Sequence, residues 1–295
     1  MCTLIVIHQR LPGVPLVVAA NRDEFYDRPA AGPAIWTHPD GNPILAPRDL
    51  LAGGTWLGLN QSGVFAALTN RPMETPDPTR RSRGLLVLDA LGYATAAKAA
   101  AAFESLRADQ HNTFNLFFAD KRDAFVVVSH DGEIRVDRLA PGTHVIGNAE
   151  PNDPHHEKTQ QIVRAAAGLD SCAGSGDVLD GLADVCRSHV GADGTTGPLG
   201  APCVHLSTED QSKKEDSRSQ SQLPTTKPHP QFQDRGYGTR CSILLKHSDA
   251  PEESKFLYAD GAPCAHPYVD STPLLTELSQ AASYTAEGPT TRTIT

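Results

Sequence analysis

The sequence predicts an α+β fold in which a sheet is covered on both faces, as in a layered sandwich of strands and helices. Two observations carry this prediction. The strand-like runs Thr3–Ile7 and Leu16–Ala20 are apolar throughout, whereas a strand with one solvated face alternates apolar and polar residues. The order along the chain is strands, helices, strands, helices and strands, which favours helices packed on sheets.

The first part of the chain is expected to be rich in strands. Turn residues from Arg10 to Pro15 join the two opening runs into a hairpin. The region from Asn21 to Gly54 contains five prolines and is expected to be mostly loop. A second hairpin turns at Asn60–Gly63, and Ser82 is expected to cap the first helix. The elements expected here are strands Thr55–Leu59 and Val64–Thr69, and helices from Ser82 to about Leu91 and from Ala94 to Arg107.

One domain is expected over residues 1–270, followed by a C-terminal tail over 271–295. Asp131-Gly132 is a strong hairpin turn between two strands. The polar segment around 207–235 cannot bury much apolar area, so a flexible insertion is expected there. The elements expected in this part are strands Asn115–Ala119, Ala124–Ser129, Glu133–Leu139, His144–Gly147, Tyr237–Leu245 and Phe256–Asp260, and helices Asp153–Ala167, Gly176–Val190 and Pro273–Ala282.

Composition argues against several functional classes. The 295 residues carry a net charge of −9 and no basic patch, so no nucleic-acid partner is expected. Neither an apolar run of ~18 residues nor a basic secretory start is present, so we expect no integral membrane segment and a cytoplasmic location. The six cysteines are scattered and form no CxxC, which argues against a zinc knuckle or a disulfide framework. We therefore expect no metal and no cofactor. Oligomeric state is not set by the sequence.

Cys2 is the residue best placed for nucleophilic chemistry, because it directly follows Met1. Removal of Met1 would place a thiol, of pKa ~8.5, and an α-amine, of pKa ~7.7–8.0, on the same carbon. The amine can then take the thiol proton and later return it to a leaving group. The alternative is a buried cysteine that only begins an edge strand.

The polar sequence Asn21-Arg22-Asp23-Glu24 ends the second apolar run. A hairpin would bring it beside Cys2, where Asp23 can hold the Cys2 ammonium and Arg22 can bind an anion or lower the thiol pKa. The alternative is a solvated turn. Trp56, in a Gly-Gly-Thr-Trp turn, is expected either to pack in the core or to wall a pocket.

Five motifs in order resemble the NRDE family, which includes the transport-and-Golgi-organisation-2 proteins. The resemblance extends from residue 1 to about 260 and omits the 207–235 segment. The motifs are Met1-Cys2-Thr3-Leu4, Asn21-Arg22-Asp23-Glu24 with the following Phe25-Tyr26-Asp27-Arg28-Pro29, Gly53-Gly54-Thr55-Trp56-Leu57-Gly58, Ala67-Leu68-Thr69-Asn70-Arg71 and Tyr237-Gly238-Thr239-Arg240. That family is in turn similar to cysteine-type N-terminal-nucleophile hydrolases, which implies a four-layer αββα sandwich.

The resemblance also implies a set of site residues. Cys2 matches the nucleophile and Asp23 the acid that orients its amine. Two amides match polar site groups, Asn70 as an oxyanion-hole residue and Asn148 as a second polar residue. Arg240 matches an arginine near the last sheet strands, while Asn21, Arg22 and Trp56 are candidates for substrate binding. The hydrolases place an arginine a few residues before the acid, whereas Arg22 immediately precedes Asp23.

Two functions of different kinds follow. The first is an N-terminal-cysteine hydrolase or acyltransferase that acts on a linear amide or a thioester. The second, which the resemblance implies, is a non-catalytic protein that binds or carries a lipid, an acyl-CoA or haem, with a role in haem or lipid homeostasis. In both cases the partner is a small acyl, lipid or haem ligand. A scaffold that acts only through protein partners is a third possibility.

Overall fold

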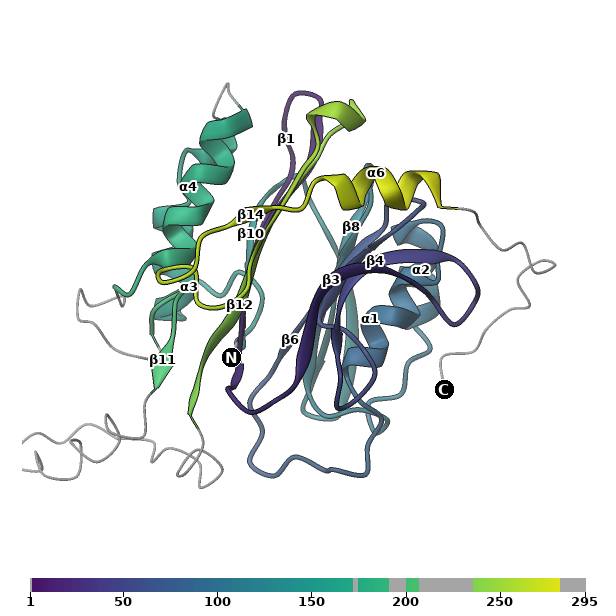
Figure 1. Cartoon of the computed structure of the whole chain (residues 1–295). Helices are drawn as coiled ribbons and strands as arrows, with labels where there is room; N and C mark the ends of the chain where they lie inside the picture. Colours follow the sequence, from purple (N-terminus) through teal and green to yellow (C-terminus); the bar gives the residue numbers. More distant parts are fainter. Residues whose placement is uncertain (1, 172–174, 191–199, 207–235, 282–295) are drawn as a thin grey trace, which may run out of the picture.

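Two antiparallel sheets of seven strands each form the centre of the protein. The computed structural model describes residues 2–171, 175–190, 200–206 and 236–281, and all strands of the two sheets lie within these ranges. The sheets stack face to face and carry helices on their outer faces (Figure 1). This arrangement confirms the expected αββα sandwich.

The first sheet has the strand order β10-β1-β2-β12-β13-β14, and β11 also pairs with β12. β1 and β2 are neighbouring interior strands that form the opening hairpin of the chain, so the predicted hairpin is confirmed. The strands of this sheet are β1 (Cys2–Leu11), β2 (Val14–Phe25), β10 (Gly142–Ile146), β11 (His205–Leu206), β12 (Tyr237–His247), β13 (Lys255–Ala259) and β14 (Val269–Asp270).

The second sheet is a meander in which every strand pairs with the next strand in the chain, from β3 to β9. Such a layout needs only short hairpin connections, except where two helices are inserted after β6. Its strands are β3 (Ala30–Thr37), β4 (Pro43–Asp49), β5 (Leu57–Asn60), β6 (Phe65–Asn70), β7 (Phe114–Ala119), β8 (Ala124–His130) and β9 (Glu133–Leu139).

Helices cover the outer face of each sheet. α3 and α4 pack on the first sheet, against β10, β2 and β12, whereas α1 and α2 pack on the second, against β5 to β8. α6 contacts β13, β3 and β4 and thus closes one side of the sandwich (Figure 1). The helices are α1 (Gly84–Leu91), α2 (Ala96–Phe103), α3 (Glu157–Ala165), α4 (Ser175–Arg187) and α6 (Pro273–Gln280), with 3-10 turns at Leu169–Ser171 and Pro251–Glu253.

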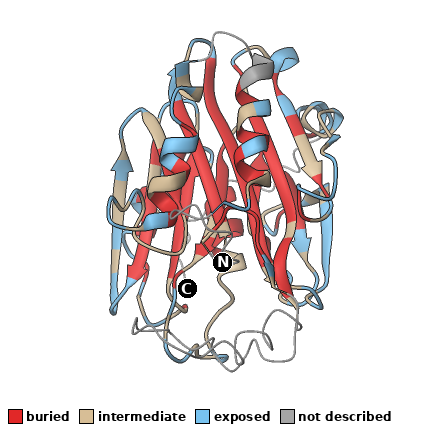
Figure 2. Cartoon of the chain, turned by 90° about the vertical axis from the view of Figure 1, so that its left-hand side faces the viewer, coloured by how far each residue is buried: buried red, intermediate tan, exposed pale blue. Residues whose placement is uncertain are grey.

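Three apolar clusters hold the four layers together, one at each interface between layers. Alternate residues of β1 and β2 supply two of them, because successive side chains of a strand point to opposite faces. Leu4 and Val18 pack between the sheets, while Ile5 and Val17 pack under α3 and α4. The strand interiors are accordingly buried on both faces (Figure 2). This explains why the opening runs are continuously apolar.

The prediction that the region from Asn21 to Gly54 is mostly loop is wrong, because this region contains the end of β2 and all of β3 and β4. Its prolines lie where a strand tolerates a missing N–H donor. Pro33 lies in the bulge of the edge strand β3, Pro43 begins β4, and Pro47 is opposite the bulge and beyond the β4–β5 pairs. The prolines therefore mark irregularities in a hairpin rather than its absence.

Helix ends differ from those expected. Ser82 does not cap α1, since Arg83 is the N-cap residue and its side chain makes no capping hydrogen bond. The helix expected over Ala94–Arg107 is confined to α2, which Thr95 caps by accepting the Lys98 N–H. The last strand is β14 rather than the strand at Phe256–Asp260, which is β13.

Some expectations lie outside the described residues, namely the insertion over 207–235 and the part of the tail from 282 to 295. Where the structure is described, none of the helices combines the length and the apolarity that crossing a membrane requires.

The Gly-Gly-Thr-Trp turn owes its glycines to backbone contacts. Gly53 has φ +73°, in the left-handed region that favours glycine. A Cβ on Gly54 would lie 2.6 Å from the backbone carbon of Gly84, where α1 begins. The Thr55 N–H donates to the Gly84 carbonyl at 3.2 Å, so this close approach fixes the segment that carries Trp56.

We predict that Gly54→Ala destabilises the protein by roughly 1–3 kcal/mol, because the added methyl forces α1 away from the turn. Chemical denaturation monitored by circular dichroism measures this change. Gly142→Ala is the matched control, since its Cβ would meet nothing closer than 3.6 Å. Equal stability of the two variants would contradict the close-packing explanation.

Candidate functional site

Cys2 begins β1, an interior strand of the first sheet that has β10 on one side and β2 on the other. It pairs with Arg22 of β2, so the expected proximity of the Asn21–Glu24 segment to Cys2 is observed. Cys2 is half-buried and lines a narrow cavity between the two sheets, on the same face of β1 as Leu4. Burial raises the pKa of its thiol, which the backbone N–H of Asp23 and the charge of Arg22 oppose.

Asn148 connects Cys2 to the second sheet. Its side-chain oxygen accepts the backbone N–H of Cys2 at 3.2 Å, and its amide nitrogen donates to the backbone carbonyl of Asn70. Asn148 follows β10 and Asn70 ends β6. The structure thus brings three of the sequence-predicted residues together at one end of the sandwich.

Asn115 fixes the loop that carries Asn148, and sequence reasoning missed it. Its amide nitrogen donates to the carbonyls of Gly147 at 3.0 Å and Ala149 at 2.9 Å, while its oxygen accepts from Arg71 at 3.2 Å. The fully buried Asn115 lies within the apolar strand β7. A buried amide needs hydrogen-bond partners, so an asparagine inside an apolar strand was the available signal.

Arg22 and Trp56 form one wall of the cavity. The Arg22 guanidinium lies 4.3 Å from the Trp56 ring centroid, and one of its nitrogens is 3.8 Å from Glu24. Arg22 is only 5 % exposed, so its charge lies inside the site rather than on the surface. The cavity measures about 10 Å³, close to the minimum that holds one water molecule. A ligand larger than a water molecule therefore fits only if Trp56 or its neighbours move.

Asp23 lies on the opposite face of β2 from Arg22, toward α3 and α4. Its carboxylate accepts the Thr239 hydroxyl at 2.7 Å. Burial raises the pKa of the Asp23 carboxyl, and the nearby Lys158 ammonium of α3 is the largest opposing charge. Burial likewise lowers the pKa of Lys158, which Asp23 opposes. Asp23 and Lys158 therefore each oppose the pKa shift that burial causes in the other.

Lys158 and Arg83 are two further groups that sequence reasoning missed. Lys158 is 9 % exposed, and its nitrogen is buried with no hydrogen-bond partner. Arg83 donates to the Thr113 carbonyl at 3.0 Å; burial lowers its pKa, and the charges of Glu24 and Cys2 oppose this. Neither belongs to a motif that would distinguish it from an ordinary surface cation, so the fold alone locates them.

Two predicted residues are engaged elsewhere. The Asn21 amide nitrogen donates to the carbonyls of Cys186 and Pro202, at 2.9 and 3.0 Å, and so ties β2 to the segments outside the sheet. The Arg240 guanidinium lies 5.8 Å from the Tyr26 ring centroid, at the bulge of β12 between Thr239 and Cys241.

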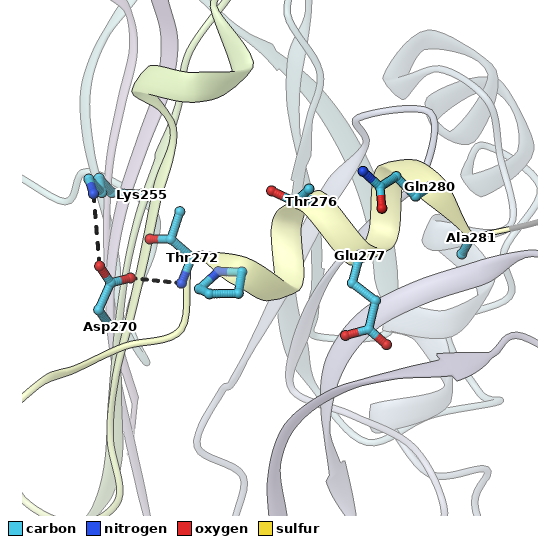
Figure 3. A pocket seen from close by; sticks show the side chains of 8 residues that line it. Lys255, Asp270, Thr272, Thr276, Glu277, Gln280 and Ala281 are labelled. Atoms are coloured by element: carbon cyan, nitrogen blue, oxygen red, sulfur yellow. Dashed lines mark hydrogen bonds and ion pairs between the residues drawn. The ribbon is translucent and has the colours of Figure 1, made fainter.

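A larger hollow of about 780 Å³ lies beside α6 (Figure 3), and Cys2 is not among its lining residues. Its polar groups bond to each other: Asp270 pairs with Lys255 at 3.8 Å and accepts the Thr272 N–H at 2.8 Å. It is open and holds neither a nucleophile nor a buried unpartnered charge among its lining residues. The chemistry-bearing residues are at Cys2, despite the smaller cavity there.

Comparison with known proteins identifies one family. The Transport and Golgi organisation 2 family model matches residues 1–256. The homologous protein of Bos taurus is 37% identical over 150 residues, and that of Homo sapiens 37% over 148 residues; each match covers 45% of this chain and 50% of the relative. The chain thus spans about half the length of the curated relatives it matches.

Several solved structures are similar over most of the chain. They include a variant conjugated bile acid hydrolase from Clostridium perfringens, with a TM-score of 0.45 and 11% identity over 92% of this chain and 93% of that one. Penicillin V acylase from Agrobacterium tumefaciens has a TM-score of 0.45 and 15% identity over 95% and 88% of the two chains. Likenesses at these scores do not establish a shared site.

We predict that Lys158→Met makes stability more sensitive to pH. Without the Lys158 ammonium the pKa of buried Asp23 rises further above its unfolded value, so stability is lost as pH increases from about 4 through that raised pKa. Each additional pKa unit is worth about 1.4 kcal/mol. Urea unfolding at pH 5 and pH 8 measures the loss.

The Asp23→Asn change in the Lys158→Met background provides the control, because it removes the titrating group. This double variant should return the difference in unfolding free energy between pH 5 and pH 8 to the wild-type value or below. A Lys158→Met profile parallel to that of the wild type would mean that the two charges do not interact.

Proposed function

The chain belongs to the Transport and Golgi organisation 2 family, and on that premise we propose that it is an N-terminal-cysteine hydrolase or acyltransferase. Its substrate is a linear amide or a thioester. Cleavage before Cys2 creates the α-amine that serves as its base. The observation that carries the proposal is the 3.2 Å hydrogen bond from the Cys2 nitrogen to Asn148, because Cys2 also lines the cavity.

The reaction begins with transfer of the Cys2 thiol proton to the α-amine. The thiolate attacks the substrate carbonyl carbon and forms a tetrahedral oxyanion. When that intermediate collapses, the ammonium returns its proton to the leaving amine or thiol, and an acyl group remains on Cys2. Water or another acceptor, deprotonated by the α-amine, then releases the acyl group and restores the thiol.

Each neighbour has a distinct role in this proposal. Asn148 is a positioning residue, since both ends of its amide already hold the Cys2 nitrogen and Asn70. The Asn70 side-chain amide supplies the oxyanion donor. Asp23 is the carboxyl that stabilises the ammonium, and the Lys158 charge opposes the rise in its pKa that burial causes. Arg22 and Trp56 contact the acyl side of the substrate, and Arg240 with Tyr26 contacts more distant parts.

A covalent acyl adduct on Cys2 is the expected result of incubating the protein with a panel of amides and acyl thioesters. Intact-mass and peptide spectrometry locate the adduct, and the same spectra report whether the chain begins at Cys2. Cys2→Ala should form none. An active protein that retains residues before Cys2 would exclude the amine as base.

Loss of the Asn70 amide should lower kcat by roughly 10²–10³, with little change in KM, because an oxyanion contact forms only in the transition state. Steady-state kinetics of Asn70→Ala measure this against Asn42→Ala, whose side chain is exposed. Asn148→Ala should instead shift the pH dependence of kcat, because it frees the amine. A fall in Asn70→Ala that is confined to KM would assign Asn70 to substrate binding.

The second candidate is non-catalytic binding of a lipid, an acyl-CoA or haem. Two buried or half-buried cations beside Cys2, Arg22 and Arg83, favour an anionic ligand and support this candidate. Ligand retention that survives Cys2→Ala but not Arg22→Gln supports carriage. Turnover that is lost in Cys2→Ala supports catalysis.

A further inference from the structure

Four side chains with metal-binding atoms converge beyond the first sheet, outside the proposed catalytic groups. They come from three separate segments: His189 follows α4, Cys203 precedes β11 and His205 begins it, and Cys264 follows β13. One ligand atom of each lies within 4.8 Å of all the others. The long separations in sequence explain why no spacing motif reveals them.

The measured distances match the edges of a small tetrahedron. The Cys203 and Cys264 sulfurs are 3.6 Å apart, and the His205 Nε2 lies 3.7 Å from the first and 3.1 Å from the second. A tetrahedral zinc ion with bonds of ~2.3 Å to sulfur and ~2.0–2.1 Å to nitrogen places its ligands roughly 3.3–3.8 Å from one another. Only shifts of a few tenths of an ångström separate these three atoms from that geometry.

The fourth side chain completes the set. The His189 and His205 ring centroids are 5.1 Å apart with an interplanar angle of 37°, so both imidazoles face the same small volume as the two sulfurs. Cys203 is 1% exposed and forms the floor, whereas His205 and Cys264 are exposed at the rim, which leaves a path for an ion.

We propose that His189, Cys203, His205 and Cys264 bind one Zn²⁺ ion in a structural site. Two thiolates and two imidazoles in a tetrahedral set favour zinc over magnesium or calcium, which prefer oxygen ligands. Four protein ligands leave no open position, so the ion has no water to activate and serves to crosslink segments. On binding, the two thiols lose their protons to solvent and become thiolates.

The site would crosslink the segment over 200–206 to α4 and to the turn after β13. That segment already bonds to its surroundings: the Cys203 N–H donates to the Ser188 carbonyl at 3.0 Å. The next residue reaches the proposed catalytic end, since the Val204 N–H donates to the Thr239 hydroxyl at 2.9 Å, which in turn donates to Asp23 at 2.7 Å. Zinc thus stabilises the segment that bonds to Thr239, which in turn holds Asp23, and it does so without contacting Cys2.

Metal analysis of the full chain, purified without chelators and under reducing conditions, tests the proposal. We expect one zinc per chain by inductively coupled plasma mass spectrometry, and a tetrahedral cobalt–thiolate spectrum after exchange with Co²⁺. Cys264→Ser should lose both signals, and because Cys264 is exposed this change should leave the fold intact. His205→Gln provides a second variant at an exposed position.

His155→Gln is the matched control, because His155 is an exposed histidine outside the cluster. It should retain one zinc per chain, as should Cys2→Ala, so the result does not depend on the proposed enzymatic function. Chelation should lower the thermal midpoint of the wild type, and added zinc should restore it there but not in Cys264→Ser.

Three results would overturn the proposal. The first is a reduced wild-type protein that binds no zinc. The second is zinc that persists in both Cys264→Ser and His205→Gln. The third is a disulfide between Cys203 and Cys264 in the purified protein, detected by peptide mass spectrometry, because a disulfide removes both thiolate ligands.

Discussion

The pairing of Cys2 with Arg22 is the constraint on which the rest of the site depends. It places the first described residue of the chain in an interior strand of a sheet that is buried on both faces, rather than at a frayed end. From that position alternation assigns the faces: Arg22 lies toward the cavity between the sheets, and Asp23 lies toward the helices. One strand end therefore supplies a cation to one side of Cys2 and a carboxylate to the other.

Buried charge is the cost of this arrangement, and the fold offsets it locally. Asp23 and Lys158 each lose hydration, which shifts both pKa values toward the neutral form, but each favours the charged form of the other. Burying an isolated charge is far more expensive than burying a pair. The Lys158 charge thus favours the ionised form of Asp23, which is the form that holds an ammonium group in the proposed mechanism.

Local patterns in the sequence predicted the hairpin, the layered fold and the grouping of Cys2 with Asp23, because these depend on neighbouring strands. They did not predict β3 and β4, since prolines at a bulge look like a loop when the partner strand is unknown. Nor did they predict Lys158, Asn115 or the cluster around Cys203. These residues meet their partners only through contacts between distant segments, and scattered cysteines gave no sign that two of them meet.

The central claim is that a free α-amine on Cys2 activates its own thiol, and the most direct measurement is the alkylation rate of Cys2 as a function of pH. Peptide mass spectrometry separates Cys2 from exposed Cys264. The protein that begins at Cys2 should react at lower pH than a matched protein with an uncleaved N-terminal extension, in which burial raises the thiol pKa and no free α-amine shares the carbon that carries the thiol. Identical pH profiles for the two proteins would contradict the account.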